Sequence, residues 1–310
     1  MNTFEKIQDL LRTRAEQRLK LSLIPYDGTV EVKTVGDNKY LYIRKREVGK
    51  IKSTYIGPFS DDLYNLLLRN SKEAKELRKQ IRLLEKELAK IGYEENDLSA
   101  EVLLNLEFAR ANMKTIIYDQ AVLEGVATTF PDTETIIENG QVNNMKADDV
   151  QKILNLKHAW EFILDKDVIL APSNYDLSSY IAKIVNEGFY QDGGRIRGVP
   201  VMIGGSSYLP PIPVESKVKE DIDAIVSSDH DKVDKAMELM LYIMKTQVYN
   251  DGNKRTAVIF ANHYMIANAL GLFIIPYDKV SEFKQKLVLY YEDKDLVSVK
   301  EFLKGCWVHN

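Results

Sequence analysis

Residues 245–276 read KTQVYNDGNKRTAVIFANHYMIANALGLFIIP, and this stretch indicates how the rest of the chain is organised. An acid, a Gly-Asn pair and two cations, Asp251 to Arg255, stand directly before a long apolar run. A helix that is apolar nearly all round is typical of the centre of a domain, so we expect a buried helix over 256–270. The start of such a helix carries unpaired N–H groups and partial positive charge, which favours phosphates.

The residues before this helix each fit a phosphate site. Gly252 allows a ligand to approach the backbone closely, and Asn253 tolerates turn conformations and caps helices. Lys254 and Arg255 add full positive charge. Asp251 fits if it holds a hard cation such as Mg²⁺, which itself bridges to phosphates. The residue types therefore indicate a site for a metal and a nucleotide; the alternative interpretation is an ordinary turn with solvated cations.

The same stretch resembles the signature of the Fic (filamentation induced by cAMP) family of the Fic/Doc superfamily, whose core reads His-x-Phe-x-Asp/Glu-Gly-Asn-Gly/Lys-Arg. Residues 247–255 match this core, although the motif is degenerate because Gln247 stands in place of the histidine. Upstream, GFYQDGGRIRGVPVMIGG at 188–205 looks like the β-hairpin flap of the family, followed by a proline-rich connector. Residues 120–125 are similar to its inhibitory helix.

The resemblance implies a mainly α fold, in which residues 94–310 form a Fic-type helical core with the flap at 188–205 and the motif loop at 247–258. It also implies that ATP or another nucleoside triphosphate binds with Mg²⁺, and that AMP moves to a hydroxyl side chain of a target protein (AMPylation). Asp251 would hold the metal. The nucleotide would be bound by Gly252, Asn253, Lys254 and Arg255, and the target would dock as an added strand on Ile196, Arg197, Val199, Val201 and Met202.

Gln247 changes the expected chemistry. The histidine of the family is a general base, and a carboxamide has no useful basicity near neutral pH. Loss of a positioned base costs on the order of 100- to 10,000-fold in rate, so we expect a protein adenylyltransferase-like chain with reduced or lost activity. His230, in a polar turn, and His263, in the buried helix, are weak replacements; we expect His263 to be a hydrogen-bonded core residue.

Two alternatives stay open. The chain could be a non-enzymatic, nucleotide-binding regulatory module. It could also be a phosphotransferase similar to Doc, because Lys254 matches that branch of the superfamily. The resemblance implies a second arginine three residues after the first, but this position is Val258. Glu124, the candidate inhibitory residue, is therefore expected to lack its partner, and it could equally be a simple helix-end carboxylate.

Residues 1–93 lie outside the resemblance and predict a small α+β domain. A first helix ends before Pro25, a β-hairpin spans 39–57, and Ser60 begins a long charged helix. The helix carries an apolar seam that could mediate a homodimer or pack within its own domain. The seam consists of Leu77, Ile81, Leu84, Leu88 and Ile91.

The hairpin mixes cations with Tyr40, Tyr42 and Tyr55, a pattern that could contact phosphates and stack on bases. A solvated face is the preferred interpretation, and a nucleic-acid partner is judged unlikely because the 310-residue chain has a net charge of -4. Its only cysteine, Cys306, cannot form an internal disulfide. Since no run of about 18 apolar residues or signal peptide is visible, we expect a cytoplasmic protein without a membrane partner.

Overall fold

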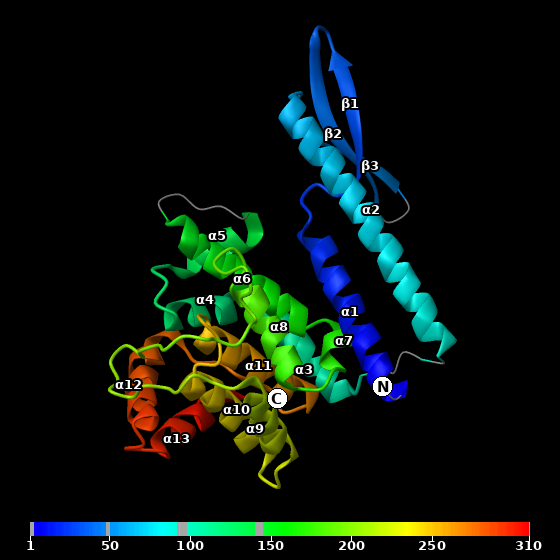
Figure 1. The fold of residues 1–310 in the computed structure, drawn as a ribbon. Coiled ribbons are helices and arrows are strands. Elements are labelled where there is room, and N and C mark those ends of the chain that lie inside the picture. Colours follow the sequence, from blue (N-terminus) through cyan, green and yellow to red (C-terminus); the bar gives the residue numbers. More distant parts are fainter. Residues whose placement is uncertain (1–2, 48–49, 92, 94–97, 140–144, 310) are drawn as a thin grey trace. The chain divides into compact units, whose positions relative to one another are not determined.

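The computed structural model describes residues 3–47, 50–91, 93, 98–139 and 145–309. The chain divides into two compact units, Met1–Glu95 and Asn96–Asn310, drawn in Figure 1. The second unit is mainly helical and the first combines two helices with a small sheet. The predicted fold class, a mainly α protein with a smaller α+β part, is therefore confirmed.

The first unit is a three-stranded antiparallel sheet with two long helices. Strand β2 is central, and the sheet includes a strand, β1, that the sequence interpretation did not contain. Ser60 caps the second helix by accepting a hydrogen bond from the Leu63 N–H. The elements are α1 (Thr3–Leu23), β1 (Thr29–Val35), β2 (Asn38–Glu47), β3 (Lys50–Pro58) and α2 (Asp61–Lys90).

Helix α2 contributes to two hydrophobic clusters among the described residues of this unit. Leu41 and Ile43 of the sheet pack on Leu67 in the first part of α2. Further along the helix, Leu88 packs against Leu10 and its neighbours on α1. Figure 1 shows α1 and α2 of this unit as ribbons. Much of the apolar seam that suggested a homodimer is thus covered by α1 of the same unit.

The second unit builds its core around α11 (Asn253–Ala267), which packs against helices α3, α6, α8 and α10. Nearly every side chain of α11 is buried, so the predicted buried helix is confirmed. The other elements of the unit are α3 (Ala100–Ala111), α4 (Met113–Leu123), α5 (Phe130–Asn139), α6 (Ala147–Ile163), α7 (Lys166–Ile169), α8 (Tyr175–Val185), α9 (Glu215–Ser227), α10 (Lys232–Thr246), β4 (Leu272–Phe273), η1 (Tyr277–Lys279), α12 (Val280–Tyr291), α13 (Ser298–Lys304) and β5 (Trp307–Val308).

The flap segment 188–205 differs from its prediction. It contains turns and extended backbone instead of a β-hairpin, and its β-bridge joins Ile196 to Tyr249 of the motif loop. The Arg197 side chain turns inward and donates to the Val199 carbonyl, which removes an acceptor that a partner strand would need. Pro200 also lacks the N–H that a strand ladder requires. The segment therefore attaches to the motif loop instead of pairing with itself.

Candidate functional site

The motif loop joins α10 to α11 through two residues with left-handed backbone. Gln247, which follows the last residue of α10, has φ 50° and ψ 59°, and Gly252, directly before α11, has φ 70°. A Cβ atom at position 252 would lie 2.8 Å from Val185 Cγ1 and 2.9 Å from Asn186 Oδ1, so glycine is required there. Between the two turns, the buried Tyr249 hydroxyl bonds Ser178 Oγ at 2.7 Å and anchors the loop in the core.

The Asn253 side chain holds the loop closed. Its Oδ1 accepts from the Tyr249 N–H at 2.9 Å, and its Nδ2 donates to the Tyr249 carbonyl at 2.8 Å. The amide is therefore used within the protein, which leaves only the backbone N–H of Asn253 for an anion. No side chain of the described residues caps the start of α11. The first N–H groups of the helix thus keep their capacity to donate to a ligand.

Arg255 lies between two carboxylates. Its side chain is 2% exposed and donates to Asp251 Oδ2 at 3.2 Å, while its Nε lies 3.3 Å from Glu124 Oε2. Lys254 Nζ is 3.9 Å from the other Glu124 oxygen. The arginine that the resemblance implies at position 258 is absent, and the Glu124 carboxylate at the end of α4 pairs with Arg255 in its place.

Gln247 is held by the loop itself. Its Nε2 donates to the Met244 carbonyl at 2.6 Å and its Oε1 accepts from Asn253 Nδ2 at 3.3 Å. These bonds orient a group that cannot take up a proton near neutral pH.

The two histidines considered as replacement bases lie elsewhere. His263 is fully buried and bonds Ser173 Oγ at 2.9 Å and the Val168 carbonyl at 2.8 Å. Burial lowers the pKa of His263 to about 4, so it is the neutral core residue that the sequence indicated. His230 is 60% exposed and bonds Glu238. Neither histidine contacts the motif loop through these bonds.

Asp251 could hold a metal only together with ligands from outside the protein. The described part of the chain contains no group of three or more His, Cys, Asp or Glu residues that could hold an ion. The Asp251 carboxylate is 49% exposed, and Mg²⁺ in nucleotide sites commonly takes one or two carboxylates and completes its shell with phosphate and water. Three buried oxygens around the start of α11 also have no hydrogen-bond partner among the described residues: Asn186 Oδ1, Glu124 Oε1 and Thr256 Oγ1. The residues therefore fit a bound polar ligand with Mg²⁺.

The flap residues divide into interior and surface groups. Val199 is 57% exposed and Met202 is 86% exposed, whereas Arg197 is 1% exposed. The Arg197 guanidinium donates to the carbonyls of Thr246, Gln247, Val199, Pro210 and Pro211. Arg197 thus ties the flap, the connector and the end of α10 together, and its side chain is not on the surface that a target would meet.

Other contacts of the site were missed because their partners are far apart in the sequence. Asn186 Nδ2 donates to the carbonyls of Gly193 and Asp251, which ties the motif loop to the flap. Gln120 Nε2 donates to the Arg255 carbonyl, and its Oε1 accepts from Trp160. No local pattern signals these contacts.

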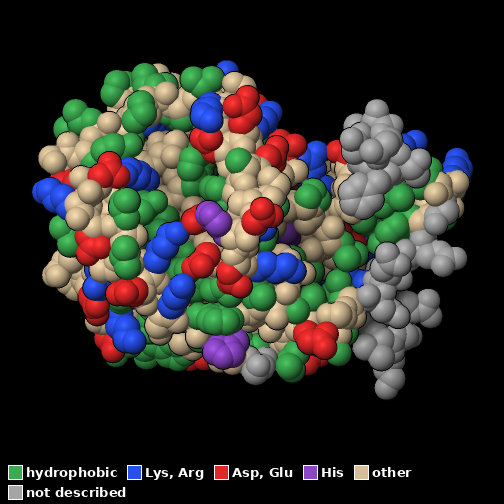
Figure 2. Space-filling view, turned by 90° about the horizontal axis from the view of Figure 1, so that it is seen from below, with side chains coloured by type: hydrophobic (Ala, Val, Ile, Leu, Met, Phe, Trp, Pro, Cys, Tyr) green, Lys and Arg blue, Asp and Glu red, His purple; other side chains and the backbone are tan. Residues whose placement is uncertain are grey.

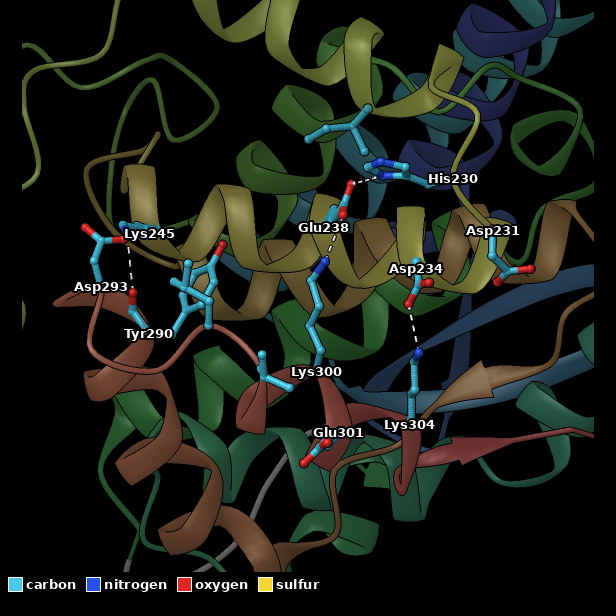
Figure 3. Close-up of a pocket in the computed structure, with 13 residues that line it drawn as sticks. His230, Asp231, Asp234, Glu238, Lys245, Tyr290, Asp293, Lys300, Glu301 and Lys304 are labelled. Atoms are coloured by element: carbon cyan, nitrogen blue, oxygen red, sulfur yellow. Dashed lines mark hydrogen bonds and ion pairs between the residues drawn. The ribbon is translucent and has the colours of Figure 1, made fainter.

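Apart from the motif loop, the second unit has a groove of about 980 Å³ beside α10 and α13 (Figure 3). Its lysines pair with its own acids: Lys300 with Glu238 at 2.8 Å and Lys304 with Asp234 at 3.1 Å. Figure 2 likewise shows Lys and Arg side chains interspersed with Asp and Glu on the face seen from below. The lining of the groove holds five Asp and Glu against three Lys, and Asp231 caps the helix start beside it, so the groove is a poorer site for a triphosphate than the uncapped start of α11.

Comparisons with known proteins give two family matches. Residues 174–265 match a family model described as the Fic/DOC family, and residues 4–65 match one described as a domain of unknown function (DUF6788). A comparison with curated proteins found no match. None of the described helices has the length and apolar character needed to cross a membrane.

Three solved structures are similar at low sequence identity, so they show the fold alone. Fic-1 (residues 134–508) from C. elegans is 18% identical with a TM-score of 0.53, covering 78% of this chain and 79% of that one. A Fic domain containing signaling protein from Bacteroides thetaiotaomicron is 15% identical with a TM-score of 0.56, covering 68% and 87%. A Fic family protein from Desulfovibrio desulfuricans is 15% identical with a TM-score of 0.51, covering 69% and 74%.

Proposed function

The chain carries a Fic/DOC family domain that includes residues 174–265, and on this premise we propose that the motif loop binds a nucleoside triphosphate with Mg²⁺. We propose further that the protein is a nucleotidyltransferase of the Fic type, which acts on a hydroxyl side chain of a target protein and whose transfer is reduced or lost at Gln247. ATP is the nucleotide expected from the family.

The observation that carries this proposal is the start of α11. Uncapped backbone N–H groups, Lys254 and Arg255 supply positive charge at one point, and Asp251 supplies a carboxylate beside them. Phosphate oxygens are expected at the N–H groups of Gly252 to Lys254. A bound Mg²⁺, held by Asp251, would neutralise charge on the phosphates.

Glu124 competes with the ligand for Arg255. Because its carboxylate lies 3.3 Å from Arg255 Nε, a phosphate must displace it before Arg255 can donate to the phosphate. A competing buried ion pair of this kind lowers affinity for an anion. Glu124 therefore acts as the inhibitory residue in this proposal, although it uses Arg255 in place of a second arginine.

The surface for the target is the outer side of the flap and connector. Val199 and Met202 of the flap and Leu209, Ile212 and Val214 of the connector are all exposed apolar side chains. Apart from Pro200 and the bonded carbonyls of Val199 and Ile203, the backbone of 198–205 can pair with an extended target segment, in which case the apolar residues supply contacts and the backbone supplies affinity.

Gln247 limits the proposed transfer reaction. In AMP transfer the target hydroxyl oxygen bonds the α-phosphorus, the bond to the bridging oxygen of the β-phosphate breaks, pyrophosphate leaves, and the hydroxyl proton needs an acceptor. A glutamine side chain cannot accept it. The carboxamide does remain compatible with binding, which is why a non-enzymatic nucleotide-binding module is the second candidate function.

A labelling experiment separates the candidates. The protein is incubated with cell lysate and Mg²⁺, using ATP labelled on either the α- or the γ-phosphate, and CTP, GTP and UTP labelled on the α-phosphate. Slow labelling of a protein from the α-phosphate, lost in Asp251→Asn, is the expected result. Labelling only from the γ-phosphate would identify the Doc-like phosphotransferase instead.

Calorimetry supplies the complementary measurement. Binding of ATP with Mg²⁺, weakened by Arg255→Ala, without labelling from any nucleotide would establish the regulatory module. Absence of both binding and labelling, in the native chain and in Glu124→Ala, would contradict the whole proposal.

A further inference from the structure

The three-stranded sheet of the first unit has one covered face and one open face. Leu41 and Ile43 point toward α2, so the alternating residues Tyr40 and Tyr42 lie on the opposite face. The register places β1 and β3 residues beside them, with Tyr55 opposite Tyr42. We name this open side the tyrosine face; it consists of Glu31, Lys33, Tyr40, Tyr42, Arg44, Ser53 and Tyr55.

The aromatic rings of the tyrosine face form one cluster at the surface. The Tyr55 ring centroid lies 5.4 Å from that of Tyr42 and 6.1 Å from that of Tyr40. Lys33 Nζ sits 4.3 Å from the centre of the Tyr42 ring. Tyr55 is 51% exposed. Grouped aromatic side chains that remain accessible beside cations are typical of a binding surface.

The strand region also has a positive net charge, although the net charge of the whole chain is negative. Residues 29–58 contain seven Lys and Arg against three Asp and Glu, which gives this segment a net charge of +4 in a chain of net charge -4. Within the face, Glu31 lies 3.7 Å from Lys33. Arg44 is exposed and forms no ion pair with any residue that the structure describes. A charge balance taken over the full chain therefore does not exclude a polyanion at this sheet.

We propose that the tyrosine face binds single-stranded nucleic acid, with bases stacked on the tyrosines and phosphates held by Arg44 and Lys33. Positive charge selects a polyanion, and flat rings select a ligand with flat apolar surfaces. A duplex conceals the faces of its bases, whereas a single strand exposes them, so the rings favour a single strand. Single-stranded DNA and RNA share this chemistry. This site is independent of the motif loop and of the proposed transfer reaction.

The test is fluorescence anisotropy with the full chain and three probes of about 20 nucleotides, namely oligo(dT), oligo(U) and a mixed-sequence duplex. We expect both single strands to bind more tightly than the duplex, and binding to weaken between about 50 and 200 mM salt. A difference between oligo(dT) and oligo(U) distinguishes DNA from RNA as the ligand.

Three variants locate the binding. Tyr55→Ala is expected to weaken single-strand binding on the order of 10-fold, whereas Tyr55→Phe keeps the ring and the affinity. Arg44→Glu is expected to weaken binding and flatten its salt dependence. Lys75→Glu, an equal charge change on the exposed side of α2, is the matched control and should bind like the native chain.

Three outcomes would overturn the proposal. The first is no binding of either single strand at about 100 µM protein, which is the weak end of nonspecific binding. The second is a preference for the duplex with Tyr55→Ala unaffected. The third is an equal loss in Lys75→Glu and Arg44→Glu, which would indicate attraction to the chain in general. Arg44 is exposed, so its substitution leaves the core intact and keeps the test decisive even where Tyr55→Ala unfolds.

Discussion

Arg255 is the residue whose contacts determine access to the motif loop. Its guanidinium is shared between Asp251 of the loop and Glu124 of α4. The first contact is local, four residues along the chain, and the second joins helices distant in sequence. A phosphate that binds Arg255 replaces its contact with Glu124 and can leave its contact with Asp251 in place.

Glu124→Ala is therefore expected to raise the affinity for ATP with Mg²⁺. Releasing Arg255 restores a charge-assisted hydrogen bond to phosphate, a change on the order of 10-fold in dissociation constant. Calorimetric titration of the native and variant chains measures it. Glu282→Ala, which removes an exposed carboxylate paired with Lys286, is the control and should leave the affinity unchanged. Equal affinities in all three chains would contradict the role of Glu124.

Arg197→Met is expected to lower the free energy of unfolding by about 3 kcal/mol, because it leaves several buried carbonyls without a donor. Denaturant titration measures the loss. Arg195→Met is a close control, since the Arg195 side chain is 77% exposed and such surface changes fall within about 0.5 kcal/mol. If both variants were equally stable, the five carbonyl contacts of Arg197 would not stabilise the flap.

Residue types in the loop could be predicted from the sequence, but their pairings could not. The loop residues at the start of α11 are neighbours in the sequence, so their proximity could be predicted. These residues are Asp251, Gly252, Lys254 and Arg255. Glu124 meets Arg255 only because α4 ends beside α11. The sequence gives no signal for the contact between Glu124 and Arg255, since Val258 occupies the position at which the resemblance implies the partner of Glu124.

At the scale of elements, α11 contains a buried histidine whose tautomer is fixed by its neighbours. The Val168 carbonyl can only accept, so His263 Nε2 carries the proton and Nδ1 accepts from the Ser173 hydroxyl. Protonating Nδ1 would break this arrangement. This explains chemically why His263 stays neutral within the core.

The pH dependence of stability follows from this histidine. Burial lowers the pKa of His263 to about 4, below the value of 6.5 in the unfolded chain, so the unfolded state binds a proton first as the pH falls. Stability present above pH 6.5 is lost progressively toward pH 4, by about 2 kcal/mol between about pH 7.5 and pH 5. His158, whose pKa burial also lowers to about 4, acts in the same direction.

Denaturant titration of the native chain, His263→Gln and His230→Gln at the two pH values tests this expectation. The loss of stability on acidification should shrink only in His263→Gln. Asp119, whose pKa burial raises to about 6, acts in the opposite direction but is common to all three chains. An unchanged acid-induced loss in His263→Gln would show that His263 does not contribute.

Elements with strong periodicity were predictable, and those set by tertiary contacts were not. The apolar run of α11 and the capped start of α2 both appear as expected. Alternation in 188–205 suggested a hairpin, but inward-facing Arg197 binds the Val199 carbonyl, which pairing would use. Strand β1, TVEVKTV, has the alternation of a strand and ends at a Gly36 turn, a signal that the sequence interpretation missed.

At the scale of the whole molecule, two compact units place the two proposed binding sites on separate hydrophobic cores. The sequence predicted a larger helical and a smaller α+β part because the long charged helix is expected to end at Gly92-Tyr93 and residues 1–93 lie outside the family resemblance. The boundary at residue 93 stays a prediction, and we expect the two sites to bind their ligands independently of each other.

Leu11→Ala tests this independence. Leu11 is 1% exposed in the cluster between α1 and α2, so its truncation should destabilise the first unit by about 3 kcal/mol. The affinity of the motif loop for ATP with Mg²⁺ should stay unchanged in calorimetry. Ile243→Ala, at a buried position on α10, is the comparison and should weaken nucleotide binding. A change in nucleotide affinity in Leu11→Ala would show that the units are coupled.

The central claim is that the motif loop binds a nucleotide despite Val258, and that the missing base at Gln247 limits transfer. The most direct measurement compares Glu124→Ala with Gln247→His/Glu124→Ala in labelling from α-labelled ATP, since both chains have Arg255 released. Histidine is enriched in left-handed backbone, so position 247 accommodates it. We predict a rate increase on the order of 100- to 10,000-fold in the double variant. Equal rates in the two chains, at equal ATP affinity, would contradict the account.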